Sequence, residues 1–124
     1  MTTFLLATSS VHVTAAAADY LQNRLDPGDG DDIVVVAVRD PDVPSRDAGD
    51  AVNVARSRLA GFVPTTETRE GEPVTEVLAA IDNHDPDELL IGPHRGIDDS
   101  DGVGSTVRDL LTRADCPVII LPLP

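Results

Sequence analysis

The stretch from Gly92 to Thr106 holds the residue types that bind an anion: four glycines, followed by the ending Gly104-Ser105-Thr106. Glycine lets backbone N–H groups approach a ligand closely, and amides and hydroxyls at a helix N-terminus favour negative charge. His94 and Arg95 lie in the same stretch, where arginine can pair bidentately with a phosphate and histidine can stack or donate a hydrogen bond. The pattern predicts a phosphate-binding loop, and the alternative is an ordinary loop with a Ser/Thr helix cap.

Composition removes several other chemistries. The chain of 124 residues has 17 Asp, 5 Glu and 9 Arg but no lysine, with a formal net charge of −13. A Walker A loop, a Schiff base, a Ser-Lys nucleophile and protein-kinase chemistry all need a lysine, so these classes are excluded. The negative charge argues against a duplex nucleic acid or an anionic membrane as partner, because both require a basic face.

The same composition suggests where the protein works. An Asp-rich, lysine-free chain with 2% aromatic residues is typical of proteins from halophiles, whose molar salt screens carboxylate repulsion; the alternative is an ordinary acidic protein. We expect a cytoplasmic protein, because no apolar run approaches the ~18 residues of a membrane span and the N-terminal stretch lacks a basic signal region. Cys116, the one cysteine, cannot form an internal disulfide and is predicted to be a buried, inert thiol.

Hydropathy predicts a single α/β domain over residues 1–124, in which five strands alternate with four helices. Residues 33–38 are apolar throughout, which is typical of a parallel strand buried on both faces. Gly61 is expected as the left-handed residue after the second helix, and Leu111 as an inward residue of the last. The strands are predicted at 4–7, 33–38, 62–68, 88–92 and 118–121, and the helices at 14–25, 52–59, from 73 to the stop at 83–86, and 105–114.

This order predicts a doubly wound, Rossmann-like parallel sheet, which binds ligands beyond the carboxyl ends of its strands. Residues 89–122 resemble the universal stress protein family, through the strand, the glycine-rich loop ending in Gly104-Ser105-Thr106, and the closing segment Ala114-Asp115-Cys116-Pro117-Val118-Ile119-Ile120-Leu121-Pro122. The resemblance implies an adenine nucleotide alpha-hydrolase-like fold. It also implies homodimers formed through the last strand, here Val118, Ile119, Ile120 and Leu121, and members that either bind ATP or do not.

Three departures from the family pattern bear on nucleotide binding. The family motif is Gly-x2-Gly-x9-Gly-Ser/Thr, whereas three residues separate Gly92 from Gly96 and seven separate Gly96 from Gly104, so that Arg95 occupies the place of the second glycine. Ser9 stands where ATP-binding members carry an aspartate after the first strand, and a serine supplies no charge for a metal ion. Three aspartates, at positions 98, 99 and 101, would repel a polyanion unless cations intervene.

Two functions follow as hypotheses. The first is a regulatory stress-response module that binds ATP with Mg²⁺, or another adenine nucleotide, with adenine near Ala7 and Val38, Ser9 in place of the acid, and phosphates on the loop; the loop residues are Gly92, His94, Arg95, Gly96, Gly104, Ser105 and Thr106. The second is a dimeric protein-interaction module that binds no nucleotide. Thr8, Ser9 and Ser10 either form a neutral version of the site or cap the first helix.

Neither hypothesis includes catalysis. The segment after the first strand lacks the His-x-Gly-His signature of nucleotidyltransferases, and no serine lies in a nucleophile elbow. The three histidines and Cys116 have no zinc-ligand spacing, so we predict no metal site.

Overall fold

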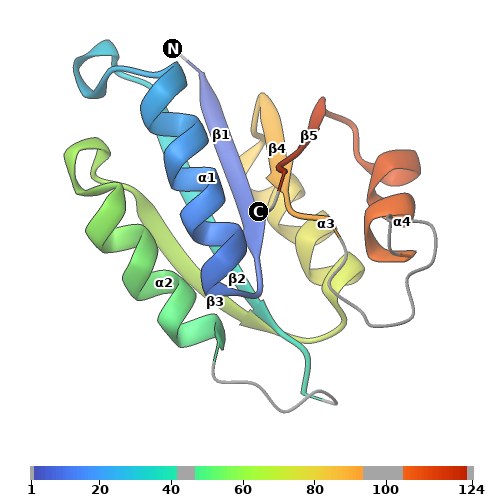
Figure 1. Cartoon of the computed structure of the whole chain (residues 1–124). Coiled ribbons are helices and arrows are strands. Elements are labelled where there is room, and N and C mark those ends of the chain that lie inside the picture. The colour runs from blue at the N-terminus through green and yellow to red at the C-terminus, as the bar shows by residue number, and fades with distance from the viewer. Residues whose placement is uncertain (1, 42–46, 94–104, 123–124) are drawn as a thin grey trace.

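The computed structural model describes residues 2–41, 47–93 and 105–122, which fold into strands alternating with helices as predicted. Figure 1 labels the elements. The strands are β1 (Thr3–Thr8), β2 (Asp32–Arg39), β3 (Thr65–Glu70), β4 (Glu88–Ile91) and β5 (Val118–Ile120). The helices are α1 (Val11–Arg24), α2 (Asp47–Arg58), α3 (Pro73–His84) and α4 (Ser105–Arg113), with short 3₁₀ turns at Pro27–Asp29 and Ala60–Phe62.

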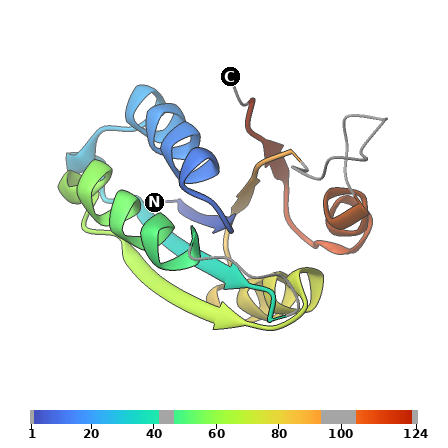
Figure 2. The same ribbon diagram turned by 60° about the horizontal axis from the view of Figure 1, so that its bottom comes forward.

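All the described strands are parallel and lie in one sheet in the order β3-β2-β1-β4-β5. The chain builds the sheet outward from β1 to β3, then returns past β1 to add β4 and β5. The order therefore reverses between β1 and β4, which is where ligands bind in doubly wound sheets. The carboxyl ends of β1 and β2 point to the bottom of Figure 1, and Figure 2 turns that end toward the viewer.

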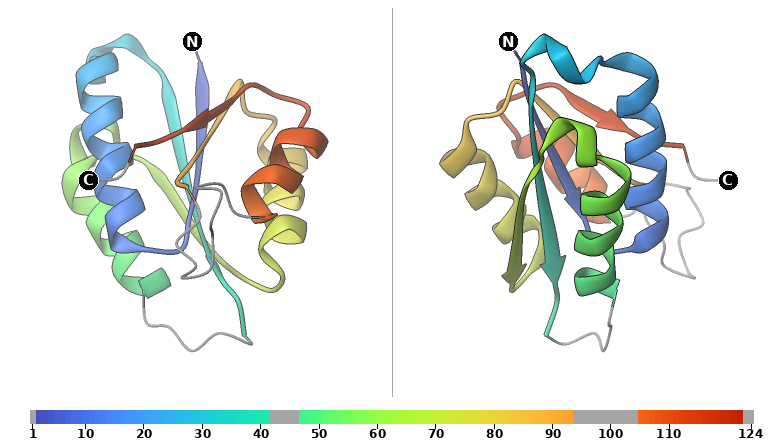
Figure 3. Two further views of the ribbon diagram at one scale, coloured as in Figure 1. Left: turned by 45° about the vertical axis from the view of Figure 1, so that its right-hand side comes forward. Right: turned by 90° about the vertical axis from the view of Figure 1, so that its left-hand side faces the viewer.

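Helices cover both faces of the sheet: α1 and α2 lie on one face, and α3 and α4 on the other (Figure 3). Side chains of β1 alternate between the two layers, so that Phe4 and Leu6 pack with α1 and α2 while Leu5 packs with α3 and α4. Every residue from Ile33 to Val38 is buried, which confirms the prediction of a strand covered on both faces. None of the described helices is long and apolar enough to cross a membrane.

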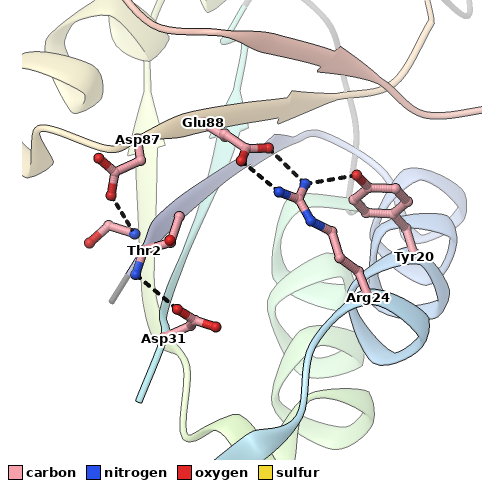
Figure 4. Close-up of polar contacts among 7 residues, drawn as sticks. Thr2, Tyr20, Arg24, Asp31, Asp87 and Glu88 are labelled. Atoms are coloured by element: carbon pink, nitrogen blue, oxygen red, sulfur yellow. Dashed lines mark hydrogen bonds and ion pairs between the residues drawn. The ribbon is translucent and has the colours of Figure 1, made fainter. Parts of the chain in front are cut away.

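At the amino ends of the strands, backbone and carboxylate groups tie neighbouring segments together (Figure 4). The N–H of Thr2 donates to the carboxylate of Asp31 at 2.8 Å, and the N–H of Thr3 donates to Asp87, also at 2.8 Å. The backbone returns the second contact, because the Asp87 N–H donates to the Thr3 carbonyl. These two acids therefore fix the start of β1 between β2 and β4. We call the end of the sheet where the strands begin the tied end.

An arginine completes the tied end. The guanidinium of Arg24, at the end of α1, donates two hydrogen bonds of 2.7 Å to the carboxylate of Glu88 and one of 2.8 Å to the Tyr20 hydroxyl (Figure 4). It also lies 4.9 Å from the centre of the Phe4 ring and 5.8 Å from that of Tyr20. The hydrogen bonds to Glu88 and Tyr20 raise the pKa of Arg24 above its ordinary value, although partial burial acts against this.

Three local predictions were wrong. Residues 60–62 form a 3₁₀ turn, so β3 begins at Thr65 and not at Phe62, and the left-handed residue is Val63 at φ 50°, not Gly61. Val63 is 84% exposed, and a β-branched residue in this conformation is strained. Leu111 is 47% exposed because the buried face of α4 is the narrow seam through Val107 and Leu110, and Leu111 lies beside it.

Candidate functional site

A cavity of about 380 Å³ opens at the carboxyl ends of the strands, at the point where the strand order reverses. We call the end of the sheet where the strands terminate the open end. Its lining comes from the ends of β1, β2 and β4 and from the first turns of helices on both faces. The lining residues are Ala7, Thr8, Ser9, Val13, Val38, Arg39, Asp40, Ala48, Pro73, Val77, Ile91, Gly92, Pro93, Thr106, Val107 and Leu110.

The three hydroxyl residues at the end of β1, Thr8, Ser9 and Ser10, have separate roles. The Ser10 side chain accepts a hydrogen bond of 3.1 Å from the N–H of Val13, so Ser10 is the N-cap of α1. Thr8 is buried, and its hydroxyl accepts from the Ser10 N–H at 3.2 Å and lies 3.1 Å from the Thr14 hydroxyl. Ser9 is exposed and lines the cavity. The cap and the cavity group are therefore adjacent residues: the cap alternative is confirmed for Ser10, and a ligand role for Ser9 stays a prediction.

Gly92 lets β4 leave the sheet against the start of α1. A Cβ atom built on Gly92 would overlap the side chain of Val13, which is itself buried and lines the cavity. A larger residue at this position would push α1 away from β4 or close part of the cavity. The glycine is thus required by a close approach of two elements that both form the site.

The cavity walls are mostly apolar. Ala7 and Val38 supply the wall at the ends of the two central strands, and Pro73 and Val77 come from the first turns of α3. Apolar walls with a few convergent polar groups are typical of small-molecule sites, and they suit the faces of a flat aromatic ring. The predicted adenine contacts, Ala7 and Val38, therefore lie on the same cavity.

The polar groups lie on two sides of the end of β1. Arg39 ends β2 and the half-buried Asp40 follows it, while Thr106 lies in the first turn of α4, the helix that follows β4. The guanidinium of Arg39 pairs with Glu70 at 3.3 Å, and its carbonyl accepts from the N–H of Gly71 at 2.9 Å. This residue therefore joins the ends of β2 and β3 at the rim.

One amide in the first turn of each of α1 and α3 is engaged by a side chain of the chain itself. Ser10 caps α1, and the Glu72 side chain accepts a hydrogen bond of 3.1 Å from the Thr75 N–H at the start of α3. An anion in this cavity would be held less easily by these two helices. The first turns of α2 and α4 also reach the cavity, through Ala48 and Thr106.

A charged cluster holds α3 against β3 behind the cavity wall. His84 Nε2 lies 2.9 Å from Glu67 Oε1, and Arg69 pairs with Glu67 at 3.4 Å and with Glu76 at 3.7 Å. Burial of Glu67 opposes its ionisation, but the hydrogen bonds from His84 and Arg69 outweigh this and lower its pKa. The cluster therefore fixes the helix that carries Pro73 and Val77.

The structure brings together five of the predicted site residues: Ala7, Ser9, Val38, Gly92 and Thr106 all line the cavity. Ser105 is the first residue of α4, while His94, Arg95, Gly96 and Gly104 lie outside the described residues. Sequence reasoning missed Arg39, Asp40, Pro73 and Val77. For the first two a signal existed, because they directly follow the apolar run 33–38, whose carboxyl end faces the ligand side of such a sheet.

Across the described ranges, no three His, Cys, Asp or Glu side chains gather as a metal site.

The sequence matches the profile of the Universal stress protein family over residues 3–122. The chain belongs to this family. A search of curated proteins found no match.

Solved universal stress proteins share the fold at low sequence identity. UspA from Lactobacillus plantarum has 18% identity and a TM-score of 0.72, covering 97% of each chain. A universal stress protein from Archaeoglobus fulgidus, solved in complex with dAMP, has 19% identity and a TM-score of 0.64, with 98% of each chain covered. A family protein from Arabidopsis thaliana, solved with AMP bound, has 17% identity and a TM-score of 0.69, covering 100% of this chain and 93% of its own.

Proposed function

We propose that this universal stress protein binds an adenine nucleotide in the cavity at the open end and acts as a regulatory module that does not turn the nucleotide over. The observation that carries the proposal is the cavity itself, of about 380 Å³ and mostly apolar, at the switch point of the sheet. The dAMP and AMP complexes of the structural neighbours support it, because those proteins share the fold over nearly the whole chain.

The arrangement of the lining suggests how the ligand lies. Adenine packs against Ala7 and Val38, and the phosphates point to the start of α4, where Thr106 donates a hydroxyl and helix amides favour negative charge. Gly92 keeps the backbone close to the ligand beside Val13. ATP with Mg²⁺ is the proposed physiological form, with the predicted loop residues His94, Arg95, Gly96, Gly104 and Ser105 on its phosphates.

The test is calorimetric titration of ATP with Mg²⁺, and of AMP without it, in molar KCl. Gly104→Asp places a carboxylate in the proposed phosphate loop and is expected to abolish micromolar binding. Gly28→Asp is the matched control, because Gly28 lies in the 3₁₀ turn before β2, with open space around it. Equal loss in both variants would point to net charge. No heat and no protection from thermal unfolding in the unaltered protein would refute nucleotide binding and favour the interaction module.

Absence of turnover is tested separately. We expect ATP and Mg²⁺ incubated with the protein to yield no more ADP, AMP or phosphate than the buffer alone. Release that scales with protein concentration and disappears in Gly104→Asp would contradict a purely regulatory role.

We also propose a homodimer through β5, which the family resemblance implies. β5 is the last strand in the sheet order, and Ile120 on it is 40% exposed. An apolar edge strand left open invites pairing with another chain. Val118 and Ile119 are half-buried. Leu121 is 0% exposed and packs in the core, so its side chain does not reach the proposed interface. Ile120→Arg is expected to give monomers in sedimentation, and an unaltered protein that is monomeric at working concentration would refute the dimer.

A further inference from the structure

The buried polar side chains of the described residues gather at one place, beside the cavity. Thr8 ends β1, Ser10 caps α1 and Thr14 lies one turn further along this helix, with exposed fractions of 5%, 0% and 0%. The other buried side chains in the described part of the chain are apolar. A buried hydroxyl costs free energy unless it is hydrogen-bonded, so three of them at one end of the sheet require a specific arrangement.

Thr14 connects the two residues that flank the middle of the turn between β1 and α1. Its hydroxyl lies 2.9 Å from the carbonyl oxygen of Ser10 and 3.1 Å from the hydroxyl of Thr8. The Thr8 hydroxyl in turn accepts the Ser10 N–H at 3.2 Å and lies 3.0 Å from the same carbonyl oxygen. The two ends of the turn are therefore bonded to each other, and Thr14 bonds both of them to the body of the helix.

The hydroxyl of Thr14 is not needed to pack α1 on the sheet. The other buried residues of this helix are apolar: Val13, Ala17, Ala18 and Leu21. Valine is branched at Cβ like threonine and carries a methyl group in place of the hydroxyl, so it would fill the same space. The hydroxyl therefore serves the turn, which a fully bonded buried network holds in one conformation.

Ser9 is the middle residue of this turn and lines the cavity. Both of its neighbours in the chain are buried and belong to the network, whereas Ser9 is exposed. Because Ser9 is one residue from each of them, the network sets its place on the cavity wall. A group that is already held in place loses less conformational entropy when a ligand binds, so it contributes more to affinity.

We propose that Thr14 is a positioning residue of the nucleotide site: its hydroxyl holds the turn so that Ser9 meets the nucleotide. Thr14 is fully buried and is not part of the cavity lining, so it acts on the ligand through Ser9. The inference rests on the proposed nucleotide binding and on the predicted ligand role of Ser9, and it adds a residue that affects affinity without touching the ligand.

The experiment is a double-mutant cycle on the affinity for AMP, measured by calorimetry in molar KCl. Ser9→Ala and Thr14→Val are each expected to weaken binding about fivefold, the effect of one neutral hydrogen bond. The double variant is expected to bind about as weakly as Ser9→Ala alone, because Thr14 then has no ligand group left to position. Two independent effects would instead multiply to about 25-fold.

Controls separate the positioning role from packing and folding. Thr14→Ser retains the hydroxyl and is expected to recover the affinity to within about twofold of the unaltered protein. Thr112→Val removes an exposed hydroxyl that bonds only carbonyls of its own helix, those of Arg108 at 3.3 Å and Asp109 at 3.0 Å, and is expected to leave the affinity unchanged. Thermal unfolding without ligand checks that each variant folds, and Thr14→Ala takes the place of Thr14→Val if the latter does not fold.

The outcomes distinguish the two proposals. Unchanged affinity in Ser9→Ala or in Thr14→Val, or effects that multiply in the double variant, overturns the positioning role of Thr14 while nucleotide binding stands. The same conclusion follows if Thr14→Ser or Thr112→Val loses as much affinity as Thr14→Val. Absence of binding of AMP and ATP by the unaltered protein overturns the proposed function and this inference with it.

Discussion

The two ends of the sheet are built from similar residues to opposite effect. At the tied end, Asp31 and Asp87 accept backbone N–H groups, and Glu88 is held by two hydrogen bonds from Arg24. At the open end, Asp40 lies on a cavity whose walls are mostly apolar. The tied end is therefore closed by hydrogen bonds between neighbouring segments, whereas a cavity opens at the other end of the same sheet.

The difference shows that acidic residues have different roles at the two ends of the sheet. Acids of the tied end hold strands that are far apart in sequence, since Thr3 and Asp87 join β1 to the start of β4. The open end instead relies on packing, with Gly92 against Val13, and on the charged cluster around Glu67 behind α3. Substitutions at the two ends should therefore affect different properties.

The largest expected effect is a loss of structure at both ends of the sheet when the salt concentration is lowered. The net charge of −13 is screened over about 3 Å in 1 M salt but over about 10 Å at 0.1 M, so dilution of KCl increases the repulsion among the acids. We expect loss of helical circular dichroism as KCl falls from 1 M to about 0.1 M. A full native signal without salt would contradict the adaptation to high salt.

The next effect is confined to the open end. Gly92→Ala forces Val13 and the start of α1 to move, and is expected to lower the free energy of unfolding by about 1–3 kcal/mol. Gly49→Ala, in α2 with open space around it, is the matched control and is expected to be stabilising by about 0.5–1 kcal/mol. Denaturant unfolding measures both, and equal effects would show that the contact with Val13 is unimportant.

A smaller effect is expected from Arg24→Met at the tied end. The variant keeps an apolar stem over Phe4 but loses the hydrogen bonds to Glu88 and Tyr20, and the partly exposed pair is expected to contribute about 1 kcal/mol. Unfolding at equal salt measures the loss. Nucleotide affinity is expected to stay unchanged, and a change in affinity would show that the two ends are coupled.

Acid should weaken the charged cluster that holds α3 against β3. Because the pKa of Glu67 is lowered in the folded state, its ionisation stabilises the fold fully above the ordinary value of 4.5, and this contribution is lost as pH falls through the lowered pKa. We expect Glu67→Gln to be less stable than the unaltered protein at pH 7, by less than about 1 kcal/mol. The difference should vanish at low pH, and a difference independent of pH would rule out this charge.

The smallest effect concerns Cys116, which precedes β5 at the tied side of the sheet. Burial, and secondly the charge of Asp115, raise the pKa of its thiol, so little thiolate is present at neutral pH. We expect alkylation by iodoacetamide at pH 8 to be several-fold slower than that of a cysteine peptide, and to reach the peptide rate in denaturant. Equal rates in the folded protein would contradict an inert thiol.

Most of the fold was predictable from the sequence because its signals are local and strong. The apolar run 33–38 indicates a fully buried strand, and Pro73 marks the start of α3. The errors fall where packing overrides local preference. Val63 takes a left-handed conformation that glycine would favour, and Leu111 lies beside the buried seam of α4, which no helical period reveals.

The site was predictable in part for a related reason. The switch-point rule points to the ends of β1, β2 and β4, which is enough to find Ala7, Val38 and Gly92. It does not tell which hydroxyl faces the cavity, because Ser9 and Ser10 are chemically alike and only the geometry of the α1 cap separates them. Asp40 was missed because an acid before a proline is also typical of a turn.

The strand order has a consequence for how the chain folds during synthesis. β1 pairs with β2, which follows it closely, and also with β4, whose pairing brings Phe4 beside Glu88. Because the chain is synthesised from its N-terminus, β1, β2 and β3 can assemble early. One edge of the apolar strand β1 then stays unpaired until β4 has been made. This unpaired edge of β1 is where a nascent chain is most exposed to aggregation. Protection from aggregation would therefore matter more for the partly synthesised chain than for the folded protein.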